Sequence, residues 1–251
     1  MNKPISVKSR YWTIVAITSF LAIVGLLFFI FSGYNLTAYS LLSQLFMVVF
    51  STAFGIVSCF RWRHPLYLQI ITGGFICCFF GQLFLVCRYI FTSQSPYNFS
   101  IATLSFAGFY FFIFSAEYGA LDTLVDNKKD KSIRLHKGIS YIAPITVIVL
   151  STIAFILGEN LLELVIEAVP MVFASYFILK HIIIPDIDLG FTKPLREYYL
   201  LVMAFLVLGF LVKIFAQLGL NNVEPIVGVI RGVILLYMMP AAVRGVSKWY
   251  I

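Results

Sequence analysis

The chain has 251 residues, of which 61% are hydrophobic and only 12% are charged, and its mean hydropathy is +0.97. A soluble domain carries roughly twice that charged fraction, so the composition excludes a water-soluble globular protein. The formal net charge of +7 would favour a nucleic-acid partner in a soluble protein. In a membrane protein it instead marks cytoplasmic loops, and we expect the lipid bilayer, and no nucleic acid, as a partner.

Apolar segments separated by polar breaks predict eight membrane-spanning helices. In chain order they cover residues 12–32, 37–60, 66–91, 98–121, 139–157, 161–184, 198–220 and 226–246. Proline and glycine punctuate the breaks, as in RWRHPLY and NNVEPIV. The pair at 139–184 is separated only by GEN, so a helical hairpin that does not cross completely is an alternative there. The expected fold class is an all-α, polytopic membrane helix bundle.

The distribution of basic residues predicts the orientation of this bundle. An even number of spans places both termini on one side, and fifteen of the eighteen lysines and arginines then fall on that side. The other three, Arg88, Lys213 and Arg231, lie within a span or at its end. Because cytoplasmic loops collect basic residues, we expect both termini to be cytoplasmic, in a plasma (inner) membrane.

The loops indicate a single transmembrane domain over residues 1–251, because none is long enough to fold alone. Short similarities suggest an internal duplication within it. GYNL and GENL open the second and sixth spans, and FLVCR and FLVK lie near the outer ends of the third and seventh. An alternative organisation is therefore a parallel repeat of two four-helix halves, residues 1–125 and 126–251.

The most informative charge is Lys213, which lies in the apolar stretch LVLGFLVKIFAQLGL. A lysine at the centre of a membrane helix costs roughly 2.5–3.5 kcal/mol on translocon scales. Gly209, Lys213 and Gln217 recur every four residues, which gives the seventh predicted span one polar face. We expect another charged side chain, or a ligand, to offset the cost of this lysine.

Other ionisable residues in the outer half of the predicted spans lie at a similar height. Such residues usually turn toward the bundle interior or a wet cavity, where they pair. The sequence thus predicts an outward-facing polar pocket for a charged or zwitterionic small molecule. The predicted ligand-binding residues are Lys213, Glu167, Arg231, Glu163, Arg88 and Gln217, and Glu224 is a further carboxylate at this level. Two alternatives stay open: structural ion pairs, or long side chains that reach the headgroups independently.

On the inner side, Glu117 lies about one turn from the predicted cytoplasmic boundary, in FSAEYGALD. It is a candidate inner gate or proton-coupling carboxylate. The alternative is a pair with a basic loop residue such as Arg61 or Arg134.

Histidine and cysteine give no metal-binding pattern in this sequence. The three histidines, His64, His136 and His181, lie near the cytoplasmic face on different loops or helix ends, and we expect no metal site. The four cysteines fall inside apolar runs, where we expect them to pack as small apolar residues.

Motifs for catalysis are also missing, because the sequence contains no HExxH, GxSxG or Walker pattern. We therefore expect no cofactor and no enzyme, an intramembrane lipid enzyme being the least favoured class. The favoured function is a small transporter or permease for a charged or zwitterionic molecule. The alternative is a ligand-sensing or regulatory subunit that signals to a cytoplasmic protein partner through residues 127–137 and the tail RGVSKWYI.

Overall fold

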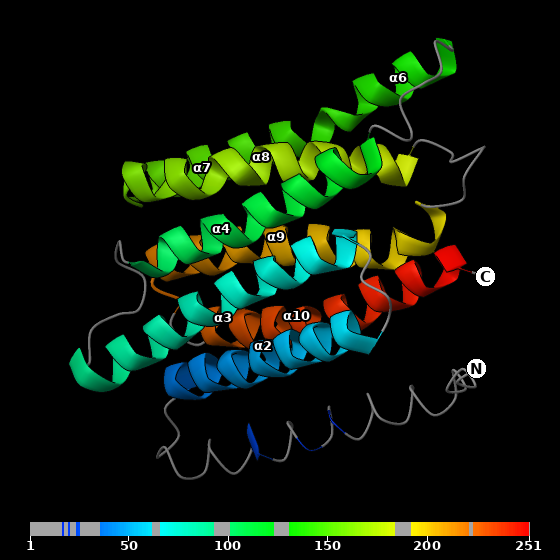
Figure 1. Ribbon diagram of the computed structural model, residues 1–251. Coiled ribbons are helices and arrows are strands. Elements are labelled where there is room, and N and C mark those ends of the chain that lie inside the picture. The colour runs from blue at the N-terminus through cyan, green and yellow to red at the C-terminus, as the bar shows by residue number, and fades with distance from the viewer. Residues whose placement is uncertain are drawn as a thin grey trace.

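The computed structural model describes residues 36–61, 66–92, 101–122, 131–183, 192–220 and 223–250, together with residues 17, 20, 24 and 25. Every element in these ranges is helical (Figure 1). Within them, seven segments are long and apolar enough to cross a membrane: Leu36–Phe60, Leu66–Thr92, Ile101–Gly119, Arg134–Ile156, Leu161–Ile183, Lys193–Gln217 and Val223–Ser247. A hydrocarbon layer about 30 Å thick requires such lengths. The chain is a multi-pass integral membrane helix bundle.

The helices follow one another with short connections. Their bounds are α2 Leu36–Arg61, α3 Leu66–Thr92, α4 Ile101–Ala116, α6 Lys131–Ser140, α7 Ile142–Ile156, α8 Leu161–Ile183, α9 Arg196–Gln217 and α10 Val223–Ser247. Three short elements flank them: the π-helical turn η1 Glu117–Asp122 continues α4, the 3-10 turn η2 Lys193–Leu195 precedes α9, and the 3-10 turn η3 Lys248–Tyr250 follows α10.

Seven of the eight predicted spans coincide with these membrane-length segments, with ends that differ by a few residues. The predicted span 139–157 starts earlier than expected, because α6 runs almost directly into α7 and the continuous apolar segment is Arg134–Ile156. At 23 residues, that segment has the length of a complete crossing. The first predicted span, 12–32, lies outside the described residues apart from residues 17, 20, 24 and 25, so the eighth helix and the internal repeat stay predictions.

By their contacts, six helices form a closed ring in the order α2, α3, α4, α8, α9 and α10, with α10 returning to pack on α2, and Figure 1 shows α10 beside α2. Helix α7 lies outside this ring against α8 and α9. Aromatic side chains fill the interior of the six-helix ring. The phenyl group of Phe109 on α4 stands edge-on to that of Phe75 on α3 at 5.5 Å and to that of Phe205 on α9 at 5.4 Å. The bundle therefore has a packed centre, and polar side chains gather toward its two ends.

Helices α2 and α10 approach closely because small residues line their contact. A Cβ on Gly232 would lie 2.8 Å from Sδ of Met47, and one on Gly55 would lie 2.6 Å from Cε of Met239. The hydroxyl of Ser51 also donates a hydrogen bond to the carbonyl oxygen of Leu235 at 2.9 Å. Small residues and interhelical hydrogen bonds are the usual means by which membrane helices associate.

Candidate functional site

The turn between α7 and α8 and the turn between α9 and α10 lie at one end of the bundle, the end that we expect to face outside (Figure 1). Helices α7 and α9 end in the same way. The backbone at Gly158 and Gly219 has positive φ, 109° and 68°. The glycine N–H and the N–H that follows it bond back to carbonyls of the last helical turn. This is the Schellman termination, which favours glycine because it has no Cβ.

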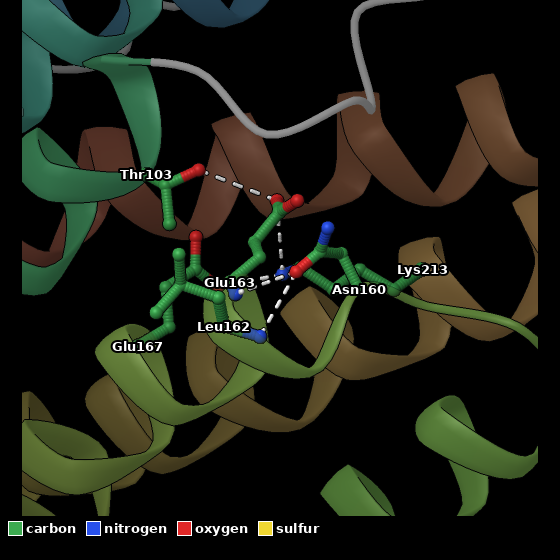
Figure 2. Close-up of polar contacts among 6 residues, drawn as sticks. All are labelled: Thr103, Asn160, Leu162, Glu163, Glu167 and Lys213. Carbon is green, nitrogen blue, oxygen red and sulfur yellow. Dashed lines mark hydrogen bonds and ion pairs between the residues drawn. The ribbon is translucent and has the colours of Figure 1, made fainter.

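The chain then enters α8 through a side-chain cap. Oδ1 of Asn160 accepts hydrogen bonds from the backbone N–H of Leu162 at 2.9 Å and of Glu163 at 3.4 Å (Figure 2). An asparagine at this position satisfies backbone donors that the first helical turn leaves open. The cap thereby fixes the backbone from which Glu163 projects.

The ammonium of Lys213 on α9 lies between two carboxylates of α8. Nζ is 2.9 Å from Oε2 of Glu167 and 3.5 Å from Oε1 of Glu163. Glu163 also accepts a hydrogen bond from Oγ1 of Thr103 on α4 at 3.3 Å (Figure 2). The three charged side chains are only 14%, 8% and 9% exposed for Lys213, Glu163 and Glu167. The two carboxylates therefore offset the cost of placing this lysine in an apolar helix.

A cavity of about 60 Å³ adjoins this ion-pair group. Its lining comes from helices α3, α4, α8, α9 and α10: Leu85, Ala102, Thr103, Phe106, Glu163, Glu167, Met171, Gly209, Phe210, Val212, Lys213 and Arg231. We call it the outer cavity. Four of the six predicted ligand-binding residues meet in its wall, which is the geometry that the polar-pocket hypothesis requires.

Arg231 forms a different kind of contact from that of Lys213. Its guanidinium carbon lies 4.3 Å from the ring centre of Phe205 and 5.6 Å from that of Phe106, so it stacks on aromatic faces. Gly209 of α9 lies beside it, and a Cβ there would be in ordinary van der Waals contact with the guanidinium at 3.5 Å. Stacking leaves the edge of the guanidinium for hydrogen bonding.

Among the residues that line the outer cavity, two buried polar atoms have no hydrogen-bond partner within the part of the chain that the structure describes. They are Nε of Arg231, a donor, and Oε2 of Glu163, an acceptor. The lining carries two carboxylates and two cations, so its formal charge sums to zero. Lys213 lies with both carboxylates where α8 meets α9, and this group has a formal charge of −1, whereas Arg231 on α10 carries +1. A neutral, bipolar cavity results.

The remaining predicted residues lie elsewhere. Arg88 is half-buried on α3, outside the cavity lining. Gln217 is exposed at the end of α9 next to the α7–α8 turn, where its Oε1 would be 3.5 Å from a Cβ on Gly158. Glu224 is buried in the first turn of α10, also outside the lining. Gln217 is the last residue of α9, so it lies one turn beyond the level at which Lys213 lines the cavity.

Sequence reasoning missed several residues around the outer cavity. Glu159, in the α7–α8 turn, is buried and near enough to Lys213 to interact with it electrostatically. Thr103 and the aromatic partners of Arg231 were missed because polar and aromatic residues of those types occur throughout the spans. The cap at Asn160 was accessible to prediction, since asparagine immediately before an apolar run is a helix-start signal.

At the other end of the bundle, Glu117 begins the π-helical turn that ends α4. Its side chain is fully buried, with the hydroxyl of Tyr67 donating to Oε1 at 2.6 Å and Nδ1 of His181 lying 2.8 Å from Oε2. Glu117 therefore contacts α3 and α8 rather than Arg134, one of the two basic partners considered as an alternative, and the side chain of Arg61, the other, lies outside the described part of the structure. The reason is that the glutamate points into the bundle interior, whereas Arg134 is exposed on α6. Single π-turns are frequent at functional sites.

Further buried polar residues surround this pair, and we call the set the inner cluster: Tyr67, Glu117, Lys180, His181, Tyr198 and Tyr199. Each of these side chains is at most 3% exposed. The rings of His181 and Tyr199 are 6.0 Å apart, and the ring of Tyr67 lies 5.3 Å from that of Trp249 in η3. The sequence placed Lys180 and His181 in a cytoplasmic end, where charged residues are ordinary, so their burial could not be foreseen.

Comparison with known proteins gives no relative: no protein-family model, curated protein or solved structure matches the chain. Within the described residues, no three His, Cys, Asp or Glu side chains come together as a metal site would require.

Proposed function

We propose that this protein binds a small zwitterionic molecule in the outer cavity and carries it across the membrane. The observation that supports this proposal is the bipolar wall of the cavity. Arg231 offers an unpartnered donor to an anionic group, and Glu163 offers an unpartnered carboxylate oxygen to a cationic group. A ligand with both charges would satisfy both atoms at once and leave no net charge in the membrane interior, where unpaired charges are costly.

The size of the outer cavity supports a small substrate. A volume of about 60 Å³ has room for a few water molecules. Pockets for drug-sized ligands typically enclose about 300–1,000 Å³, several times more. A substrate of a few heavy atoms, or one admitted by a modest separation of α8 and α9, fits these dimensions.

Transport further requires that helices in the wall of the site can move. Helix α8 carries Glu163 and Glu167 and contains Pro170 one turn further on. A proline inside a helix lacks the N–H that would bond to the carbonyl four residues earlier and thereby weakens the helix locally. Movement of α8 about this point would change the distance between its carboxylates and Lys213.

A binding role suits Lys213 better than a catalytic one. A lysine acts as a nucleophile when its amine is neutral, which requires a neighbouring cation or an apolar pocket. Lys213 instead lies between two carboxylates that stabilise its charged form. The proposal is therefore for a transport protein rather than an enzyme. The sensing alternative uses the same cavity but involves no net movement of the ligand.

Ligand binding can be tested by thermal denaturation of the purified full chain with three matched probes. Glycine carries both charges, acetate only the negative charge and methylammonium only the positive charge. We expect glycine or a slightly larger zwitterion such as β-alanine to raise Tm, and neither half-molecule to do so at the same concentration. Stabilisation by acetate or methylammonium alone would contradict the bipolar site, and no stabilisation by any of the probes would remove the basis of the proposal.

Variants connect such binding to the cavity. Arg231→Gln and Glu163→Gln should each abolish the Tm shift, whereas Glu197→Gln, a change of an exposed carboxylate, should leave it intact. Uptake of radiolabelled zwitterion into proteoliposomes then separates the two function classes. Time-dependent accumulation that Arg231→Gln abolishes supports transport, and binding without accumulation supports sensing.

A further inference from the structure

We propose that His181 and Glu117 form a proton-binding site at the inner end of the bundle, and that this site takes up and releases one proton during the working cycle. The pair is fully buried, and Nδ1 of His181 lies 2.8 Å from Oε2 of Glu117. The other carboxylate oxygen accepts the hydroxyl of Tyr67 at 2.6 Å. Buried Glu and His residues in membrane spans commonly serve as proton relays.

The contacts of the pair suit two protonation states in one geometry. When Nδ1 carries hydrogen and donates to Glu117, the proton that is gained or lost resides on Nε2 of His181. With that proton bound, the pair is an imidazolium–carboxylate ion pair. Without it, a neutral imidazole still donates to the carboxylate, and the Tyr67 hydroxyl still stabilises the negative charge. Proton exchange therefore requires no rearrangement of these three side chains.

Several titratable residues that the structure describes lie on the elements around the pair. The neighbouring titratable residues are Tyr67 from α3, Tyr198 and Tyr199 from α9, Lys180 on α8, and Arg134, His136 and Lys137 on α6, which packs against α8. Among these residue types, only histidine ordinarily changes charge between pH 5 and 8. Within the inner cluster as defined, His181 is the one histidine, and His136 on α6 is a second histidine whose signal must be separated from that of His181.

Helix α8 connects this proton site to the outer cavity. His181 lies fourteen residues after Glu167, which corresponds to roughly 21 Å along a helix. That separation excludes direct proton transfer between the His181–Glu117 pair and the carboxylate of Glu167. Pro170 lies between the two sites, so the sites communicate through movement of α8. Coupling of the proton to substrate movement rests on the proposed transport function, whereas proton binding by His181 does not.

The proton site can be tested without any substrate. The chain has only three histidines, so ring-¹⁵N-histidine labelling of the full chain gives three sets of NMR signals, which His64→Gln and His136→Gln assign. We expect His181 to pass from imidazolium to neutral imidazole between pH 5 and 8. In Glu117→Gln the ratio of charged to neutral His181 at a given pH should fall at least tenfold, because the imidazolium loses its counter-charge.

A second variant keeps the test decisive if Glu117→Gln does not fold. Tyr67→Phe removes the hydrogen bond to the carboxylate but keeps its charge, so the charged fraction of His181 should rise. A single protonation state of His181 from pH 5 to 8, or the same titration in both variants, would overturn the proton site. Failure of zwitterion binding with an intact His181 titration would instead reject the transport proposal and leave the proton site standing.

Discussion

Nζ of Lys213 on α9 lies 2.9 Å from Oε2 of Glu167 on α8, and both side chains are nearly buried. This contact joins two helices of the ring at the level of the outer cavity. Breaking a buried ion pair by removing one partner leaves an uncompensated charge, which costs far more than the intact pair contributes.

Replacing Lys213 should therefore lower stability strongly. Lys213→Met leaves Glu163 and Glu167 facing each other without a cation, and we expect a loss on the order of 3 kcal/mol in the free energy of unfolding. Chemical denaturation of the wild type and the variant in detergent micelles measures this loss in the free energy of unfolding. Combining Lys213→Met with Glu163→Gln and Glu167→Gln should recover most of the loss, since the two carboxylates no longer face each other without a cation. The exposed pair Arg244–Glu197, 3.4 Å apart, provides the control: Glu197→Gln should change stability by less than about 1 kcal/mol. Equal losses in both places would contradict the buried ion-pair assignment.

The cap of α8 should stabilise the folded protein, and it also fixes the backbone from which Glu163 projects into the wall of the outer cavity. Asn160→Ala removes the acceptor for two backbone N–H groups, and we expect a loss of about 1 kcal/mol. Asn160→Asp keeps an acceptor at the same position and should retain most of the stability. Thermal denaturation of both variants distinguishes them, and the prediction fails if alanine and aspartate behave alike.

Two glycines offer a matched test of helix packing. A Cβ on Gly245 of α10 would lie 2.9 Å from the carbonyl oxygen of Pro194 and 2.6 Å from Cδ2 of Leu195, and the backbone oxygen cannot easily move away. Gly245→Ala should cost about 1–3 kcal/mol through overpacking. Among the described residues, nothing lies within 4 Å of a Cβ on Gly138 in α6, so Gly138→Ala should be neutral or slightly stabilising because alanine favours helix. Chemical denaturation in micelles would show the difference, and a stable Gly245→Ala would contradict this packing.

The orientation of the bundle can be measured with single cysteines on a cysteine-free background. Leu218→Cys, at the exposed end of α9, should react with a membrane-impermeant maleimide in intact cells. Lys137→Cys and Lys3→Cys should react only after permeabilisation, because an even number of spans places both on the basic side. Reaction of Lys3→Cys from outside would reject the eight-span prediction, and the reverse pattern at all three positions would reverse the orientation.

Much of the arrangement follows from the sequence because membrane crossing depends on length and hydropathy alone. The sequence also indicates that Lys213, Glu167 and Glu163 lie in the same half of the bilayer, where charged side chains usually turn toward the bundle interior. Which helices are neighbours does not follow. Glu117 finds its partners 50 and 64 residues away in sequence, at Tyr67 and His181, and nothing local encodes those contacts.

The stacking of Arg231 shows a second limit to what the sequence can predict about the site. Pairing by charge alone predicts a carboxylate partner for this arginine, yet its guanidinium lies over Phe205 and Phe106. Aromatic residues make up 17% of the chain, so the sequence offers too many rings to choose among. Only the helix arrangement selects these two.

The closure of the ring between α2 and α10 has a consequence for biogenesis. Ser51 of α2 donates its hydrogen bond to a carbonyl 184 residues later, and Gly232 fits against Met47 of the same helix. During synthesis the N-terminal helices leave the ribosome first. Helix α2 therefore enters the bilayer well before its partner exists, and its serine-bearing face must wait until α10 is inserted. Assembly of the native bundle becomes a late event, and nascent chains arrested before α10 would present that face to lipids or to the quality-control machinery of the membrane.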